Sequence, residues 1–175
     1  KGQKGKNKLI KSKVFYKNKF LPKSKLNFSE NLLSKNNEDK VITFISENGF
    51  RKEQNWKQLN NNVSKIIQFF NKIKLTEKDR VAAYMSNCIE TVEGFIATSA
   101  IGAIWSSCSP DFGAQGVIER FSQIKPKILF VTDRYFYNGK EINILNRVPQ
   151  ILKKINSIKY VVVVNYPGQK YIKNN

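Results

Sequence analysis

The pattern of apolar and polar positions changes character near Asp79. Beyond it, short apolar runs alternate with segments whose apolar residues recur every three or four positions, which predicts strands alternating with helices. The predicted strands are 80–85, 103–106, 127–132 and 160–164, and the predicted helices are 90–102, 114–124 and 144–155. Continuous apolar strands are typical of a parallel sheet that is buried on both faces. The pattern therefore predicts an α/β fold, part of a doubly wound parallel sheet flanked by helices.

Each of these helices has an apolar stripe that is expected to face the sheet. The residues expected to point inward are Val92, Phe95, Ile96 and Ala100 in the first helix, Val117, Phe121 and Ile124 in the second, and Val148, Leu152 and Ile155 in the third.

A β-hairpin and a further helix are predicted before this sheet. Strands at 41–46 and 50–54 flank Glu47-Asn48-Gly49, and an Asn-Gly pair favours the positive φ angles of a tight hairpin turn. In the helix that follows, one face carries Trp56, Leu59, Val63, Ile66, Ile67 and Phe70.

The N-terminal 25 residues show no clean period, so we expect an irregular basic arm. Residues 25–33 are richer in apolar side chains that can pack against a neighbouring domain. We therefore divide the chain into a basic arm and N-terminal segment, residues 1–40, and the first part of a larger α/β domain, residues 41–175. Since the chain starts at Lys1 and stops just after a strand-like run, we expect it to be a truncated piece of a longer protein.

The formal charge of +18 raises the possibility of a basic module that binds nucleic acid. Only five of the 31 cations are arginine, the residue expected where phosphates are bound in a bidentate manner. Residues 1–40 hold 12 lysines against three acids, a net +9 and half of the total. Such a segment binds polyanions without specificity and releases them as salt rises. No specific nucleic-acid function is expected.

The composition also limits the chemistry. There is no histidine, and Cys88 and Cys108 lack CxxC spacing, so zinc sites, histidine triads and thioredoxin-type redox pairs are excluded within this chain. We expect two buried or half-buried thiols in a reducing cytoplasm. The longest apolar-rich run, 94–105, is too short to span a membrane. No metal site and no catalytic residue is predicted.

A doubly wound sheet binds ligands beyond the carboxyl ends of its strands. The loops expected there are 86–88, 106–113 and 133–140, and none matches a dinucleotide or Walker A motif. Asp111-Phe112-Gly113 spells the kinase metal-binding tripeptide, but no other kinase motif accompanies it. Lys140 lies beside a glycine in a long loop, where an ammonium can hold a phosphate, although the pattern alone favours a solvated surface lysine.

Several motifs resemble the acyl-adenylate-forming enzymes, the AMP-dependent synthetase/ligase family. They are KLNFSENLL at 25–33, DRVAAYMSNCIETVEGFIATSAIGA at 79–103, IGAIWSSCSPDFG at 101–113, and YFYNGK at 135–140. The WSSCSPDFG form is similar to the branch of the family that activates acetoacetate. Ser86 departs from the proline that the family usually has there. The similarity covers residues 25–164, most of the chain.

This resemblance implies a two-step ligase reaction that consumes acetoacetate, ATP and CoA with Mg²⁺ and releases AMP and diphosphate. The family's phosphate loop, adenine-binding motifs, acyl-pocket residues and catalytic lysine have no counterpart in this chain, so we expect it to be inactive alone and to need the remainder of its own polypeptide. A basic loop of related enzymes that contacts CoA phosphates aligns with Tyr137, Asn138, Gly139 and Lys140. A ligase for another short-chain acid remains an alternative, as does, with less support, a basic α/β module that binds nucleic acid.

Overall fold

A parallel sheet of four strands forms the centre of the molecule in the computed structural model, which describes residues 2–166. The strands are β7 (Arg80–Tyr84), β8 (Ile104–Cys108), β9 (Ile128–Thr132) and β12 (Tyr160–Val164). Their order in the sheet is β12-β9-β7-β8. The chain runs outward from β7 to β8 and then crosses to the other side of β7, so the direction of winding reverses there. This arrangement confirms the predicted doubly wound α/β fold.

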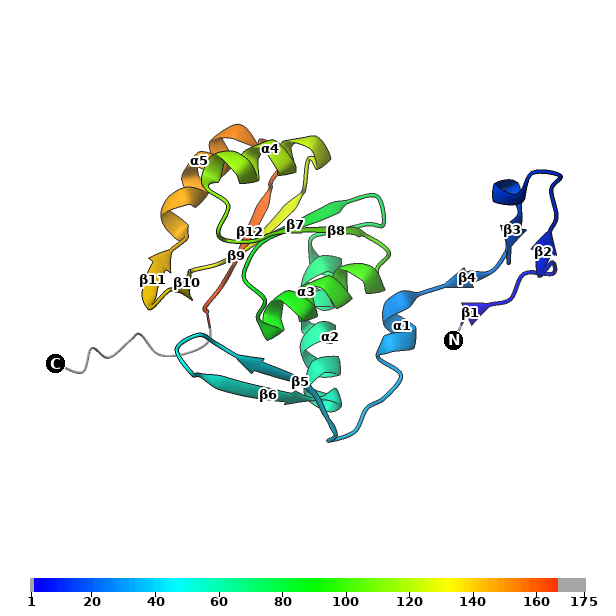
Figure 1. Cartoon of the computed structure of the whole chain (residues 1–175), viewed down its shortest axis with the longest axis horizontal. Helices are drawn as coiled ribbons and strands as arrows, with labels where there is room; N and C mark the ends of the chain where they lie inside the picture. The colour runs from blue at the N-terminus through cyan, green and yellow to red at the C-terminus, as the bar shows by residue number, and fades with distance from the viewer. Residues whose placement is uncertain (1, 167–175) are drawn as a thin grey trace.

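Helices cover both faces of the sheet (Figure 1). One face carries α2 (Trp56–Lys72) and α3 (Ile89–Ala100), and the other carries α4 (Ala114–Ile124) and α5 (Val148–Lys154). The single helix predicted over 144–155 is divided into a 3-10 turn, η2 (Leu145–Arg147), and α5. Pro149 lies in the first turn of α5, where its missing N–H does no harm.

The core is densest around the two central strands. Val81, Ala82 and Ala83 of β7 and all five residues of β9 are buried. The outer strands are more open, since Ile104 of β8 is 54% exposed and Val163 of β12 is 50% exposed. Burial on both faces therefore holds for β7 and β9 but not along the edges of the described sheet.

The inward face of α3 differs from the one predicted. Ile96 is buried, but Val92 and Phe95 are 39% and 37% exposed, and Glu93 and Gly94 are buried instead. The helix is apolar around most of its circumference, so its packing partners determine which side is buried. A Cβ on Gly94 would come within 3.1 Å of the Trp105 ring, so β8 can approach closely only at this glycine.

Glu93 links three elements of the body. Its Oε1 accepts hydrogen bonds of 2.6 Å from Gln54 and 2.7 Å from Asn62. These amides come from β6 (Arg51–Asn55) and α2, so the buried carboxylate is paired and joins both to α3.

Two antiparallel hairpins flank the sheet. The first joins β5 (Lys40–Ile45) to β6 and confirms the predicted turn at Asn48-Gly49. The second joins β10 (Arg134–Tyr137) to β11 (Lys140–Asn143). The sequence pattern predicted a long loop over 133–140, and that prediction was wrong. Asn138 and Gly139 have φ of 49° and 69° and make a tight turn of the type that Asn-Gly pairs favour.

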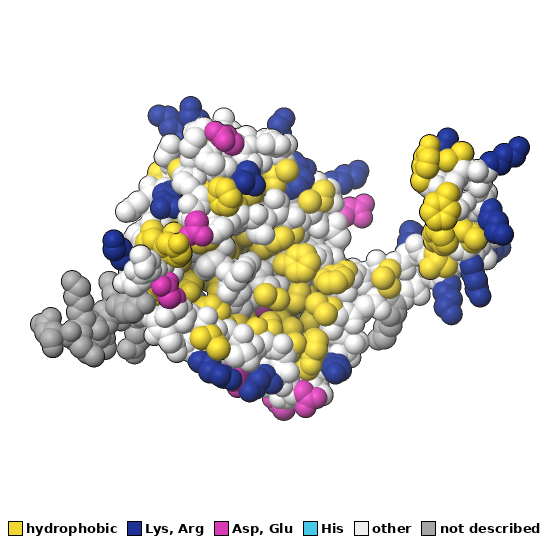
Figure 2. All heavy atoms as spheres, viewed as in Figure 1, with side chains coloured by type: hydrophobic (Ala, Val, Ile, Leu, Met, Phe, Trp, Pro, Cys, Tyr) yellow, Lys and Arg dark blue, Asp and Glu magenta, His cyan; other side chains and the backbone are white. Residues whose placement is uncertain are grey.

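The N-terminal arm projects from the body and carries exposed apolar and lysine side chains (Figures 1 and 2). Its elements are β1 (Gly2–Gln3), β2 (Leu9–Ile10), η1 (Phe15–Lys17), β3 (Lys19–Phe20) and β4 (Lys25–Leu26), followed by α1 (Phe28–Leu32). The strands pair as β1 with β4 and β2 with β3, two residues each, where an irregular arm was expected. The Ser29 hydroxyl donates to the Ile96 carbonyl at 2.7 Å and so attaches α1 to α3.

Candidate ligand site at the carboxyl end of the sheet

A cavity of about 290 Å³ lies where β7 and β8 end. Its walls are the segments 85–87, 107–111 and 135–137. The sequence predicts that these three connections meet at one end of the sheet, and the structure confirms it. Larger hollows lie on the outer surface of α2 and between the arm and α3, and one of similar size lies between the ends of α4 and α5, but none of these three is at the carboxyl end of a sheet strand. We therefore take the cavity at the carboxyl end as the candidate site.

The loop Ser109–Gly113 forms one wall of the cavity and is held on its inner side by Tyr84 and Arg147. The Tyr84 hydroxyl, at the end of β7, lies 3.1 Å from the Pro110 carbonyl and also bonds to the Phe112 carbonyl. Arg147 Nη1 donates to the Tyr84 hydroxyl at 2.6 Å and to the Pro110 carbonyl at 2.9 Å. Burial raises the pKa of Tyr84 even though the guanidinium opposes that shift, so the hydroxyl stays protonated at neutral pH.

Further contacts hold the same loop from its sides. The guanidinium of Arg120, on α4, stacks 4.2 Å from the centre of the Phe112 ring. Tyr135 is buried, and burial followed by its hydrogen bond to Asp111 raises the pKa of the phenol. The Ser109 hydroxyl donates to Asp111 at 2.9 Å. The wall is thus held by residues of β7, α4, β10 and η2.

Neither cysteine is a nucleophile at neutral pH. Both are free and buried, and burial raises the pKa of Cys88 and of Cys108. This confirms the expectation of buried thiols. Nearby, the Ser86 Oγ is buried and has no hydrogen-bond partner among the described residues.

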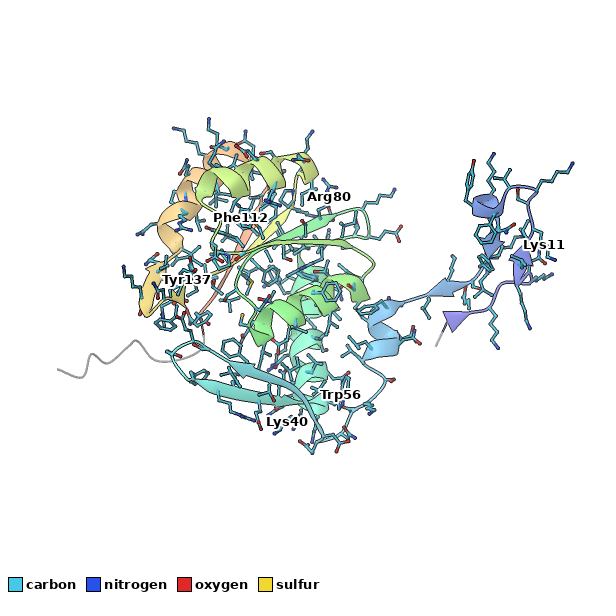
Figure 3. All side chains as sticks on the ribbon, viewed as in Figure 1. Lys11, Lys40, Trp56, Arg80, Phe112 and Tyr137 are labelled. Atoms are coloured by element: carbon cyan, nitrogen blue, oxygen red, sulfur yellow. The ribbon has the colours of Figure 1, made fainter. Side chains whose placement is uncertain are left out.

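The four residues predicted to contact CoA phosphates occupy the turn of the β10–β11 hairpin. Only Tyr137 lines the cavity, and its side chain is 61% exposed (Figure 3). Asn138, Gly139 and Lys140 are exposed at the tip. The Gly139 N–H donates to Glu47 Oε1 at 3.2 Å, so the turns of the two hairpins meet and place a carboxylate beside Lys140.

Sequence reasoning missed Tyr84 and Arg147 as residues of this site. They are 63 positions apart, and each sits in a segment whose pattern specifies only a strand or a helix. The Asn138-Gly139 pair did indicate the second hairpin, just as the Asn-Gly pair at 48–49 indicated the first. Its strands lack the apolar alternation that would have supported it.

Within residues 2–166 no three or more Cys, Asp, Glu or His side chains are grouped to hold a metal ion. Nor does that range contain a helix with the length and apolar character needed to cross a bilayer.

A doubly wound sheet with its cavity at the reversal of winding defines a nucleotide- or cofactor-binding class of α/β protein. Residues 31–173 match the model of the AMP-binding enzyme family, and the chain belongs to that family. It is 39% identical over 167 residues to the acetoacetyl-coenzyme A synthetase of Rhizobium meliloti, covering 95% of this chain and 25% of that protein.

Two further comparisons agree. Over 151 residues the chain is 40% identical to the acetoacetyl-CoA synthetase of Gallus gallus, which covers 84% of this chain and 22% of that protein. The structure of acetoacetyl-CoA synthetase from Streptomyces lividans superposes with a TM-score of 0.80 and 28% identity, covering 89% of this chain and 25% of that one. The chain therefore spans about a quarter of the length of the relatives it matches.

Proposed function

We propose that this chain is the N-terminal part of an acetoacetate–CoA ligase. The observation that carries the proposal is the 39% identity to an acetoacetyl-coenzyme A synthetase over 95% of the chain. In the overall reaction the acetoacetate carboxylate attacks ATP, which gives an acyl-adenylate and diphosphate, and the CoA thiol then displaces AMP. Mg²⁺, when bound, would supply positive charge to offset the charge that develops on the phosphates. A cytoplasmic location fits the two unpaired thiols.

The chain contributes binding surface to this reaction rather than catalytic groups. Within residues 2–166 the buried ionisable groups at the cavity are neutral phenols and thiols, which suit the packing of a ligand better than proton transfer. We propose that residues 1–40 form an N-terminal segment, that residues 41–175 begin the large domain, and that adenylation depends on polypeptide beyond this chain.

The first test is activity of the full-length protein that contains this chain. We expect it to form acetoacetyl-CoA from acetoacetate faster than it activates acetate or butyrate, and the 175-residue chain alone to form none. Faster turnover of acetate or butyrate would make it a ligase for another short-chain acid. Polynucleotide binding that survives physiological salt would instead support a nucleic-acid module.

The second test addresses Tyr137, Asn138, Gly139 and Lys140, which we propose contact the phosphates of CoA. Lys140 is exposed at the hairpin tip and beside Gly139, so its ammonium can reach a phosphate from solvent. We expect Lys140→Ala to raise the KM for CoA about fivefold, the effect of losing a solvent-exposed ion pair of about 1 kcal/mol, and to leave ATP–diphosphate exchange unchanged. Lys65→Ala, on the exposed face of α2, is the matched control. An unchanged KM for CoA would contradict the assignment.

A further inference from the structure

The loop Ser109–Gly113 is connected to the rest of the carboxyl end chiefly through two side chains, Tyr84 and Arg147. Tyr84 is 0% exposed and reaches the carbonyls of Pro110 and Phe112 from the end of β7. Arg147 Nη1 lies 2.9 Å from the first of these carbonyls and 3.4 Å from the second. Both carbonyls therefore point inward, to donors beneath the loop, and not into the cavity.

This arrangement determines which atoms the loop offers to a ligand. With the Pro110 and Phe112 carbonyls turned inward, the cavity side of the loop presents Ser109, the Pro110 ring and Asp111. Without the donors from Tyr84 and Arg147, the Pro110 and Phe112 carbonyls would need other hydrogen-bond partners, such as water. If these carbonyls turned outward, their partial negative charge would face the cavity. Such a change disfavours an anionic ligand.

Arg147 also connects this wall to the opposite one. It lies in η2, four residues after β11, so the same guanidinium that holds the loop is anchored just beyond the hairpin that carries Tyr137. Ile144, at the start of this segment, is buried, and its N–H donates to the Asp133 carbonyl at 3.0 Å. The spacing between the two walls is thus fixed through this short segment and through the hydrogen bond between Tyr135 and Asp111.

We propose that Tyr84 and Arg147 are positioning residues for CoA, which fix the Ser109–Gly113 loop as a preorganised wall of its site. The inference rests on the proposed function, since it takes CoA as the occupant of the cavity. Neither residue has to touch CoA: each acts through the loop. The three contacts converge on the single nitrogen Nη1, whose position is fixed by the length of the arginine side chain and the rigid plane of its guanidinium.

The test uses two conservative substitutions in the full-length protein. Tyr84→Phe removes only the hydroxyl, and we expect the Kd for CoA, measured by calorimetry without ATP, to rise about fivefold, as for the loss of one buried hydrogen bond. Arg147→Lys keeps the charge, but its Nζ ends one bond short of the position of Nη1, and a rise of about tenfold is expected. The KM for ATP and ATP–diphosphate exchange should stay at the parent values. Tyr160→Phe, at the sheet edge, and Lys154→Ala, in α5, are the matched controls.

A second readout needs no ligand. In the positioning account, amide hydrogens of Asp111–Gly113 exchange faster in Tyr84→Phe and Arg147→Lys than in the parent, while those of β9 do not change. Because the effects act through one loop, the double variant should bind CoA only slightly more weakly than Arg147→Lys.

The possible failures are distinguishable. If the parent protein neither binds CoA nor makes acyl-CoA, the proposed function fails. If the parent binds CoA but Tyr84→Phe binds it equally well, the positioning role is overturned, even where the loop exchanges faster. Equal increases in the KM for ATP and CoA, with a lower melting temperature, would show a general effect on folding and would also overturn it.

Discussion

At each end of the parallel sheet an arginine donates hydrogen bonds to backbone carbonyls, but the two arginines have different roles. At the amino end, Arg80 donates to the carbonyls of Ile124 and Lys125 at 2.7 and 2.8 Å. At the carboxyl end, Arg147 donates to Pro110 and to the Tyr84 hydroxyl. Arg80 and Tyr137 mark the opposite ends of the sheet in Figure 3.

What differs is the structure that each arginine closes. Arg80 caps the last carbonyls of α4, where a cation is favourable, and the hollow of about 300 Å³ beside Lys125 is lined by the ends of α4 and α5 and not by the loops that follow the strands. Arg147 instead closes a loop over a cavity. The same chemistry thus stabilises the fold at one end and shapes a binding surface at the other. A substitution at the amino end should change stability alone, whereas one at the carboxyl end should change affinity for CoA.

The largest effect on stability is expected at the amino end. Arg80→Ala leaves the end of α4 without its cap, so we expect the free energy of unfolding to fall by about 2 kcal/mol, the range for hydrogen bonds to a charged group. Urea unfolding of the 175-residue chain measures it, with Arg51→Ala on the exposed hairpin as the control. In the full-length protein the Kd for CoA should be unchanged. A weaker affinity would contradict the claim that the amino end affects stability alone.

A smaller and pH-dependent effect is expected at Asp79. Burial opposes ionisation of this carboxyl, but hydrogen bonds from Thr76 and Lys127 outweigh it and lower the pKa from the ordinary 3.8. Because the pKa of Asp79 is lower in the folded state, its ionised carboxylate stabilises the protein at pH values above the ordinary pKa. That contribution is lost as the pH falls through the folded-state pKa.

Asp79→Asn should therefore cost about 1 kcal/mol of unfolding free energy at pH 7 and almost nothing near pH 2. Urea unfolding at a series of pH values measures it. The Lys127 Nζ lies 3.2 Å from the Asp79 carboxylate, so Lys127→Gln removes the same ion pair through its other partner. The losses of unfolding free energy in the two single variants should therefore add up to more than the loss in the double variant. A cost for Asp79→Asn that is the same at both pH values would contradict the assignment.

The smallest effect concerns the hairpin tip. Glu47 accepts from the Gly139 N–H and places a negative charge beside Lys140. If CoA phosphates bind at this tip, Glu47→Gln should lower the KM for CoA about twofold by removing a weak, solvent-screened repulsion. Glu53→Gln, on β6 away from the turn, should leave it unchanged. A higher KM in Glu47→Gln would indicate that the carboxylate organises the tip and does not repel the ligand.

The elements of the sheet could be predicted from the sequence because burial imposes a period on their residues. The strands β7 and β9 and the helix α4 were placed to within a residue or two. The orientation of α3 could not, because the helix is apolar on nearly every side and the close approach of Trp105 to Gly94 depends on tertiary packing. Glu93 is polar but buried, because the side-chain amides of Gln54 and Asn62 donate hydrogen bonds to it. The spacing of apolar residues along the helix does not indicate such a pairing.

The site was predictable only in its location. Parallel strands place their carboxyl ends together, so the three connections that line the cavity could be named in advance. The pairing of Tyr84 with Arg147 could not, because it joins a strand end to a 3-10 turn through a loop whose carbonyls point inward only in the folded chain. The β10–β11 hairpin was missed because β11, KEIN, is mostly polar.

Amide hydrogen exchange of the full-length protein, with and without CoA, tests the division between the two ends most directly. We expect CoA to slow exchange in 107–113 and 134–143, at the carboxyl end, and to leave exchange in 76–80 and 124–127, at the amino end, unchanged. Protection confined to the amino end, or no protection in either pair of segments while CoA is bound, would contradict it.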